Sequence, residues 1–292
     1  MPTTTFDRQT YRTKLRQEWR EAAPGWRRWF PTLEANAAMR QISRPLLVEA
    51  ELRPGQRVLD VATGYGEPGL TIAQLVAPGG EVLLQDLSGE MLDFARDRAE
   101  WTDLREVDVS YLEGDVEELD LEDLALDAIV SRSALMYLTD PSATLARLRS
   151  FLRPGGRLTA SVWGPPSEVA FATPVPLIRD LLDLPAPELD APGLFALADE
   201  DRLAEVVRDA GFENLRIGRT TATFVFDSAG EATRFLRDCA PPVSALVDEA
   251  SPQRREQIWA RVTGEVWQPF TAEDGRVHLP NEARWISATN PG

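Results

Sequence analysis

The sequence predicts an α/β fold in which helices cover a parallel sheet, and three observations carry this prediction. From Arg57 onward, short apolar runs alternate with stretches of helical spacing, which is typical of parallel strands joined by crossover helices. The first apolar run leads directly into a glycine-rich turn and then a helix. Acidic residues follow the next two runs, where a parallel sheet presents its ligand-binding edge. The length of 292 residues allows one large domain with a substantial core.

Composition and charge exclude several classes of function. The chain carries 31 basic and 47 acidic side chains, a formal net charge of −16, which repels nucleic acids and anionic membranes. Cys239 is the only cysteine, so no intrachain disulfide or multi-cysteine zinc site can form, and we expect no bound metal. The chain does not open with a basic segment followed by an apolar run, and no stretch of about 18 apolar residues occurs. We therefore expect a cytoplasmic protein that does not insert into membranes.

The elements of the predicted sheet follow from apolar runs bounded by turn residues. Five strands are predicted at residues 58–62, 80–85, 109–113, 128–131 and 157–163. The spacing between them predicts helices at about 68–77, 88–100, 117–125 and 140–153. This order is that of successive strand–helix–strand units.

Helical additions are expected around this core. Residues 7–51 have helical spacing with breaks expected at 23–25 and at Pro31. Residues 1–44 are therefore predicted to form an N-terminal helical extension or lid on a domain that spans 45–292. The stretch 164–198 contains too much proline for one helix and predicts a cap insertion.

Regular elements are predicted again after this insertion. The pattern predicts a helix at about 199–210, closed by Gly211, and a strand at 213–219. Residues 220–226 alternate well enough for another strand, and 229–268 has the spacing of two or three helices. We expect the last apolar segment, 283–288, to return to the sheet. A second cap insertion would then occupy about 220–280.

The strongest local signal is the apolar strand that runs into the glycine-rich turn. Gly64 and Gly66 leave room for a ligand to approach the backbone at the carboxyl end of the strand. Together with Gly69 they also match the dinucleotide fingerprint Gly-x-Gly-x-x-Gly, so the motif alone does not choose between cofactors. Asp60, at the strand end, disfavours a pyrophosphate and favours a cationic cofactor without phosphate.

Two further carboxylates follow the next two strands. Asp86 ends the second strand, where its oxygens can accept hydrogen bonds from both hydroxyls of a ribose. Leu87 and Met91 supply apolar surface for an adenine. The third strand is followed by Gly114, Asp115 and Val116. Because this acid lies at the same sheet edge, its carboxylate can accept a hydrogen bond from the adenine amino group.

These motifs occur together in an order that a known family shares. With 127–131 and 152–158, they have the order and spacing of class I S-adenosylmethionine-dependent methyltransferases. The set resembles most the branch typified by ubiquinone and menaquinone biosynthesis methyltransferases, over roughly residues 45–163. Each piece is weak alone, but the set is specific. One departure is Ala62, where many relatives have glycine; its methyl group is small, and the cofactor assignment stands.

The resemblance implies both a fold and a cofactor. The fold is a Rossmann-like, doubly wound sheet of seven strands, mostly parallel with the last strand antiparallel, plus helical cap elements. The cofactor is S-adenosylmethionine, with its methionine part at the glycine turn, its ribose at the acid after the second strand and its adenine at the acid after the third. Ser131 is expected near the carboxylate end of the cofactor. The whole predicted cofactor site is Asp60, Ala62, Thr63, Gly64, Gly66, Asp86, Leu87, Met91, Gly114, Asp115, Val116 and Ser131.

Methyl transfer by in-line displacement mainly requires a positioned acceptor and the exclusion of water, so no obligatory catalytic residue follows. Near the edge of the fourth strand, Tyr137 and Asp140 are candidate general bases, and Arg132 is a candidate partner for an oxyanion. His278 is the only histidine and a further candidate, although it lies far along the chain.

The tryptophans of the N-terminal extension can line a pocket or can be the apolar face that packs on the domain. A roof over the site, made of tryptophans from the N-terminal and C-terminal segments, would favour a small, apolar or aromatic acceptor methylated at oxygen or carbon. The tryptophans of this roof would be Trp19, Trp26, Trp29, Trp163, Trp259 and Trp267. Of the extension, Trp26 and Tyr11 are candidates to face the sulfonium, since cations are attracted to aromatic rings.

Other functions remain open at this point. The glycine turn also suits an NAD(P)-dependent oxidoreductase, although no catalytic Ser/Tyr/Lys or histidine set is evident. The fold can also serve as a non-catalytic binding module, or the bound cofactor can promote a different reaction. The expected partner is a small-molecule acceptor rather than a nucleic acid, and a homodimer is left open.

Overall fold

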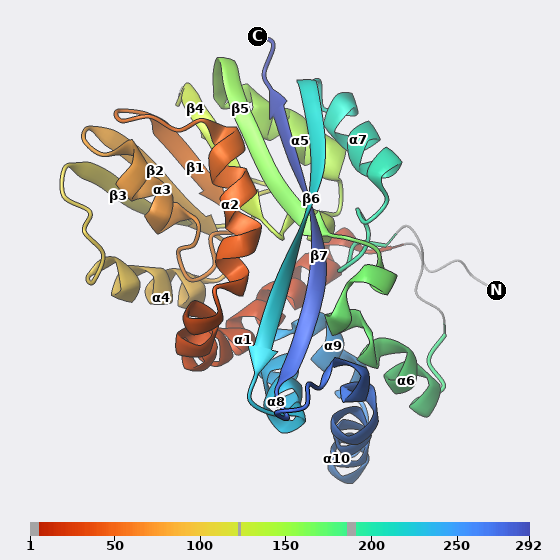
Figure 1. Ribbon diagram of the computed structural model, residues 1–292. Coiled ribbons are helices and arrows are strands. Elements are labelled where there is room, and N and C mark those ends of the chain that lie inside the picture. Colours follow the sequence, from red (N-terminus) through yellow and green to blue (C-terminus); the bar gives the residue numbers. More distant parts are fainter. Residues whose placement is uncertain (1–5, 122–123, 186–190) are drawn as a thin grey trace.

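A computed structural model describes residues 6–121, 124–185 and 191–292 (Figure 1). Its centre is a seven-stranded sheet with the order β3-β2-β1-β4-β5-β7-β6. The strands are β1 Arg57–Val61, β2 Gly80–Asp86, β3 Val107–Glu113, β4 Leu126–Arg132, β5 Leu152–Trp163, β6 Glu213–Phe226 and β7 Val277–Thr289. The pairs among β1 to β5 are parallel, and β7 is antiparallel to both β5 and β6. The predicted doubly wound sheet with an antiparallel last strand is confirmed.

Helices cover both faces of this sheet. One face carries α2 Ala38–Ala50, α3 Gly69–Val76 and α4 Gly89–Ala99, and the other carries α5 Pro141–Ser150 and α7 Glu200–Asp209. Alternation along β1 explains the two cores, because successive side chains of a strand point to opposite faces. Val58 packs in the cluster with α2 and α3, whereas Leu59 and Val61 pack in the cluster with α5 and α7.

The ladder of β6 and β7 is the longest part of the sheet. Figure 1 shows it extending past the other strands toward α8 and α10. This half of the ladder has its own hydrophobic core, which includes Phe224, Leu279 and the α8 residue Phe235. The elements around it are α6 Pro174–Leu181, α8 Ala229–Cys239, α9 Pro241–Ser244 and α10 Pro252–Arg261. Short helices join them at Pro166–Glu168, Ala170–Ala172, Ala245–Val247, Val262–Val266 and Gln268–Phe270.

Three expectations about these later elements are refined. Residues 213–219 and 220–226 form a single strand, β6, rather than two. The last strand begins at Val277, earlier than the expected 283. The segment between β6 and β7 is therefore shorter than the predicted insertion at 220–280, whose two ends belong to the ladder.

The N-terminal helix α1 runs from Arg8 to Asn36 without the predicted breaks at 23–25 and Pro31. A proline inside a helix costs about 3 kcal/mol, but here tertiary packing outweighs that cost. Trp29 and Leu33 of α1 are buried in the core beside α8. Asp238 of α8 accepts hydrogen bonds from the side chains of Arg28 and Trp29 at 2.7 and 2.8 Å. The helix ends instead at Asn36, where the next residue, Ala37, has a left-handed backbone with φ 56°.

The predicted boundary between residues 44 and 45 falls inside α2. This helix packs against β4, β5, β6 and β7, so it is part of the layer that covers the sheet. The extension proper is therefore α1, which contacts α4 and α8 rather than the centre of the sheet.

The predicted helix at 117–125 is absent from the described part of that segment, which excludes residues 122 and 123. Tertiary contacts hold the chain in a turn there. The carboxylate of Glu117 accepts the backbone N–H groups of Thr139 and Asp140 at 2.6 and 3.0 Å, and Leu119 is buried. Across the ranges that the structure describes, no helix is both long enough and apolar enough to span a membrane.

Candidate active site

A cavity opens at the carboxyl ends of β1, β2 and β4, where α1 crosses the edge of the sheet. It encloses about 1060 Å³ of empty space, including its opening to solvent. Residues from the ends of β1 to β4 and from one face of α1 form its wall. We call the part near Asp86, Leu87, Met91, Asp115, Val116 and Glu117 the carboxylate side. We call the part formed by Leu15, Trp19, Trp26, Met39, Tyr137 and Leu138 the aromatic side.

The glycine turn forms the floor of the cavity. Ala62, Gly64 and Gly66 all have left-handed backbones, with φ of 54°, 57° and 89°. A side chain added at Gly64 would meet none of the described atoms within 4 Å, so this backbone faces open space. Gly69 differs, because a methyl group there would collide with Leu84 and Asp60. The first glycine leaves room for a ligand, and the last allows close packing of α3 against the sheet.

Asp60 lies beneath this turn and not on the cavity wall. Its side chain is fully buried, and one carboxylate oxygen accepts the Thr63 hydroxyl at 2.6 Å and the Gly69 N–H at 2.8 Å. Burial raises the pKa of this carboxyl to about 7, and the bond from Thr63 and the charge of Arg132 oppose that rise. Asp60 therefore braces the turn from below, whereas the sequence placed it among the ligand contacts.

Asp86 is buried and reaches the cavity wall. Its two carboxylate oxygens accept the backbone N–H groups of Gly64 at 2.7 Å and Ser88 at 2.9 Å. Burial raises its pKa to about 6, although both of these bonds favour the ionised form. Each oxygen keeps a lone pair that can accept a further hydrogen bond from a diol.

The other predicted cofactor residues divide into two groups. The wall includes Ala62, Thr63, Gly64, Asp86, Leu87, Met91, Asp115 and Val116. Four residues lie outside it: Asp60, Gly66, Gly114 and Ser131. Gly114 supports the site through its backbone, since its N–H donates to the Asp86 carbonyl at 3.0 Å and its carbonyl accepts from Gln85 at 2.7 Å. The Ser131 side chain is fully buried in the sheet.

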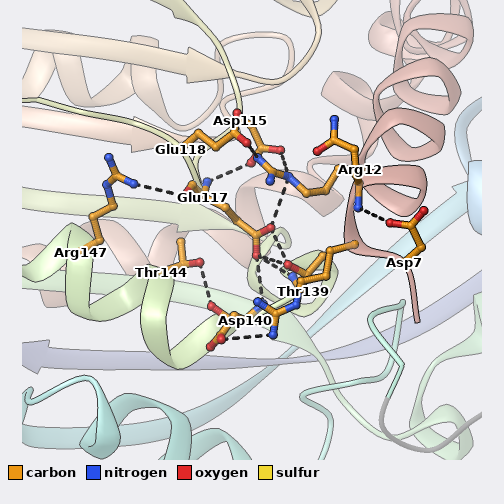
Figure 2. Close-up of polar contacts among 11 residues, drawn as sticks. Asp7, Arg12, Asp115, Glu117, Glu118, Thr139, Asp140, Thr144 and Arg147 are labelled. Atoms are coloured by element: carbon orange, nitrogen blue, oxygen red, sulfur yellow. Dashed lines mark hydrogen bonds and ion pairs between the residues drawn. The ribbon is translucent and has the colours of Figure 1, made fainter. Parts of the chain in front are cut away.

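An arginine of α1 reaches across to the carboxylate side, as Figure 2 shows. The Arg12 guanidinium donates to Asp115 and lies 3.5 Å from Glu117 and 2.9 Å from Glu118. The Arg12 and Asp115 side chains are 17% and 11% exposed, so this ion pair is largely shielded from water. Glu117 in turn binds the backbone at Thr139, and these contacts tie α1, the end of β3 and the segment after β4 together.

The aromatic side brings together rings from distant parts of the chain. Trp26 of α1 stacks on Tyr65 of the glycine turn, with ring centroids 5.7 Å apart and planes at 25°. Trp19 meets Tyr137 edge to face at 6.0 Å. Of the predicted tryptophan roof, only these two indoles lie on the wall. Trp29, Trp163, Trp259 and Trp267 instead pack in the core around the β6–β7 ladder, where burial of large rings is most stabilising.

Of the four residues predicted as catalytic candidates, two lie on the cavity wall and two lie outside it. Arg132 and Tyr137 line the cavity. Asp140 lies off the wall, where it caps α5 by accepting the Ala143 N–H at 3.1 Å. His278 is exposed on β7 opposite Val225 and is also outside the wall.

Tyr137 is suited to donate a hydrogen bond rather than to accept a proton. Burial, with the nearby Tyr11 and the charge of Glu18, raises its pKa far above that of free tyrosine. Its hydroxyl is therefore neutral at physiological pH.

Sequence patterns did not identify Arg12, Glu117, Tyr65 or Met39 as site residues, and the structure places all four on the wall. A signal was present for the α1 residues. Residues 12, 15, 19 and 26 are spaced by three, four and seven positions, which places them on one face of a helix. That face is recognised only when α1 is known to continue through its prolines.

Comparisons with known proteins agree with this geometry. A family model described as a methyltransferase domain matches residues 52–176. The ubiquinone/menaquinone biosynthesis C-methyltransferase UbiE of Vibrio parahaemolyticus is 30% identical over 183 residues, which cover 59% of this chain and 70% of that protein. The chain belongs to the class I S-adenosylmethionine-dependent methyltransferases.

Two more relatives of this methyltransferase define the extent of the likeness. An uncharacterized 37.1 kDa protein in transposon TN4556 of Streptomyces fradiae is 30% identical over 213 residues, and the chain spans only 56% of its length. A putative methyltransferase from Bacillus halodurans has the same fold, with a TM-score of 0.58 and 20% identity over 85% of this chain and 98% of its own. Family membership decides between the cofactors that the glycine motif left open: the cofactor is S-adenosylmethionine.

The residues of the cavity fit this cofactor. Open space in front of Gly64 admits a ligand to the turn, and the ionised Asp86 can accept from a ribose diol. Leu87, Met91 and Val116 offer apolar surface for an adenine. The acidic groups of the carboxylate side would repel a pyrophosphate, which S-adenosylmethionine lacks.

Proposed function

We propose that the chain transfers the methyl group of S-adenosylmethionine to an oxygen or carbon of a small, apolar or aromatic acceptor. The observation that supports this proposal is the aromatic side of the cavity, where Leu15, Trp19, Met39 and Leu138 face the space next to the glycine turn. Such a wall binds an apolar ring by burying its surface. It offers few hydrogen bonds to compensate a strongly hydrated acceptor for the water that it would lose.

We also propose that α1 serves as a lid for this site, as the sequence predicts for the N-terminal extension. The helix supplies Leu15, Trp19 and Trp26 to the aromatic side and Arg12 to the carboxylate side. A single helix thus contacts both regions, which supports a role in closing the cavity over the bound cofactor and acceptor. Closure of this kind excludes water and orients the reacting groups.

When bound, S-adenosylmethionine supplies a methyl group activated by the positive sulfonium. The task of the chain is then to place the acceptor in line with this methyl group, which can supply a large part of the rate enhancement. The rings of Trp26 and Tyr65 provide an electron-rich surface beside the turn, and cations are attracted to such surfaces. The neutral Tyr137 hydroxyl is a hydrogen-bond donor for an acceptor oxygen.

The expected cellular setting follows from composition. The single cysteine and the strongly acidic charge are consistent with a cytoplasmic protein that acts on a small molecule rather than on nucleic acid.

Turnover of a matched acceptor panel tests the proposed function. The full chain is incubated with S-adenosylmethionine labelled with ¹³C in the methyl group and with small phenols, hydroquinones and polyketide-like enols. Amines and sugar acids of similar size serve as the polar comparison. We expect labelled product only with the apolar and aromatic acceptors, and NMR assigns the methyl group to oxygen or carbon.

Two outcomes would contradict the proposal. Preferential methylation of the polar acceptors would show that the aromatic side does not select the substrate. Micromolar binding of S-adenosylhomocysteine without turnover of any acceptor class would favour the non-catalytic binding module.

A further inference from the structure

Arg132 occupies an unusual place at the end of β4. Its guanidinium donates to the Ser43 hydroxyl of α2 at 2.9 Å and to the Tyr65 hydroxyl of the glycine turn at 3.1 Å. Both partners are neutral, and the side chain also lines the cavity. The arginine is therefore held in a defined position beside a space that a ligand can enter.

Arg132 forms no direct ion pair on the described wall, although its charge acts on the buried Asp60 carboxyl beneath the turn. The basic residues of the described wall are Arg12 and Arg132. Arg12 lies within 4 Å of three carboxylates, those of Asp115, Glu117 and Glu118. Within the ranges 6–121, 124–185 and 191–292, no carboxylate lies that close to Arg132. A partly buried cation that makes no direct ion pair is costly, so a ligand that brings an anion to it is favoured.

Arg132 and Asp86 contact neighbouring residues of the glycine turn, at different points on the cavity wall. Asp86 accepts the N–H of Gly64, and the next residue, Tyr65, accepts from Arg132. The turn thus separates an acid suited to a ribose from a cation at its other end. In S-adenosylmethionine the ribose and the carboxylate are likewise separated, by the sulfonium and the rest of the methionine chain.

We propose that Arg132 binds the carboxylate of the methionine part of the cofactor, with Tyr65 and Ser43 as positioning residues for its guanidinium. This assignment rests on the cofactor orientation given above. It replaces the sequence-based role of Arg132 as partner of an acceptor oxyanion. It also gives the site a means of distinguishing an adenosyl amino acid from other adenosine thioethers, because a guanidinium pairs well with a carboxylate.

Binding to the cofactor-free full chain tests this proposal without relying on turnover. S-adenosylhomocysteine carries the carboxylate, whereas 5′-methylthioadenosine keeps the adenine, ribose and sulfur but lacks the amino-acid part. In Arg132→Met we expect the affinity for S-adenosylhomocysteine to fall roughly 10- to 100-fold, the range of a lost charge-assisted hydrogen bond. The affinity for 5′-methylthioadenosine should stay within about twofold, since its contacts are unchanged.

A second arginine provides a matched control. Arg98 lies 5.2 Å above the same Tyr65 ring but pairs with Glu67 at 3.0 Å and is outside the wall. Arg98→Met should not weaken S-adenosylhomocysteine selectively over 5′-methylthioadenosine. Tyr65→Phe, which removes only the hydroxyl that accepts from Arg132, should give a smaller loss of about two- to tenfold with the same selectivity.

Two results would contradict the proposal. Equal losses for both ligands in Arg132→Met would mean that the arginine only shapes the turn. An unchanged affinity for S-adenosylhomocysteine would mean that Arg132 does not bind the cofactor and would favour its earlier role as a partner for an oxyanion of the acceptor. If Arg132→Met does not fold, Arg132→Lys takes its place, since it keeps the charge but not the geometry of the guanidinium. This variant must also lose affinity for S-adenosylhomocysteine while keeping its affinity for 5′-methylthioadenosine. Absence of labelled product from the wild type in the acceptor panel would contradict the proposed function and leave these binding results valid.

Discussion

The two sides of the cavity are constructed in different ways. On the carboxylate side, Asp86 ends β2 and Asp115 follows β3, so the order of the strands alone brings them to one edge. On the aromatic side, Trp19 and Trp26 come from α1, and Tyr137 comes from the segment after β4. Strand topology places the first set, whereas the docking of one long helix places the second. We therefore expect the family-wide cofactor to be held by the fold and the acceptor to be contacted mainly by an addition to it.

The largest effect that this comparison predicts is for Asp86→Asn. The carboxylate accepts two backbone N–H groups, and it is the proposed partner of the ribose. An amide nitrogen in place of one oxygen faces a donor with another donor, so we expect both a weaker turn and a loss of about 100-fold in S-adenosylhomocysteine affinity. Titration calorimetry gives the affinity and thermal unfolding gives the stability. The exposed Asp108→Asn on the neighbouring strand is the control that should change neither. Full affinity in Asp86→Asn would remove the acid from the cofactor site.

The pH dependence separates the two roles of Asp86. Because burial raises its pKa from 3.8 to about 6, the folded chain binds this proton more tightly than the unfolded chain does. Its contribution to the stability of the cofactor-free protein is therefore greatest at low pH and is lost as pH rises from about 4 to about 6. A ribose donates to the ionised form, so cofactor affinity should change in the opposite direction.

Calorimetry between about pH 5 and 8 checks this expectation. The affinity should rise by up to about tenfold per unit as pH increases through 6 and then level off. In Asp86→Asn the inflection near 6 should disappear. The buried Asp60, whose pKa is raised to about 7, is not itself part of the wall and is expected to alter stability more than affinity. An affinity that falls with rising pH would contradict the assignment.

The sequence predicts the carboxylate side of the cavity better than the aromatic side. The five parallel strands were identified from local patterns, and the antiparallel last strand was implied by the family resemblance. Of the twelve residues predicted for the cofactor site, eight lie on the cavity wall. Asp60 was recognised correctly as part of the motif, but a sequence does not show whether a carboxylate at a strand end points up to the ligand or down to brace the turn. Only the bonds to Thr63 and Gly69 reveal that.

The aromatic side was predicted less well for a physical reason. Prolines at 24 and 31 indicate helix breaks, and only the packing of Trp29 and Leu33 in the core beside α8 overrides that local preference. Without a continuous α1, the spacing that unites Arg12 with Trp19 is invisible. A tryptophan's local sequence also does not tell a wall residue from a core residue, so Trp259 and Trp267 were assigned to a roof that they do not join.

A substitution on the aromatic side should affect the acceptor and spare the cofactor. Trp19→Leu removes the ring that meets Tyr137, and aromatic pairs contribute about 0.5–1.5 kcal/mol beyond the area they bury. We expect kcat/KM for the best acceptor to fall about tenfold, with S-adenosylhomocysteine affinity within about threefold of the wild type. Trp101→Leu, at a tryptophan that is 90% exposed, is the matched control. Equal losses for acceptor and cofactor would show that the two sides are not independent.

Arg12 is the point at which the two sides meet. It belongs to α1 but pairs with Asp115 and Glu117 on the carboxylate side. Arg12→Ala should therefore speed dissociation of S-adenosylhomocysteine by about three- to tenfold and reduce the dependence of that rate on salt. Stopped-flow fluorescence at several ionic strengths measures both. Arg16→Ala, at an exposed arginine one turn along the helix, should behave as the wild type. A dissociation rate that does not change would mean that α1 does not close over the cofactor.

The smallest expected effect concerns the floor that both sides share. Ala62 has a left-handed backbone with φ 54°, a conformation that costs an L-residue about 1–2 kcal/mol and glycine almost nothing. Ala62→Gly relieves that strain, but it also adds freedom to the unfolded chain, worth about 0.4–1 kcal/mol, and removes a half-buried methyl group. We expect the strain to prevail slightly, so the free energy of unfolding in urea should rise by up to about 1 kcal/mol. S-adenosylhomocysteine affinity should not change. Lower stability would mean that the methyl group packs usefully against the adjacent core, and that alanine is retained here for the fold rather than tolerated beside the cofactor.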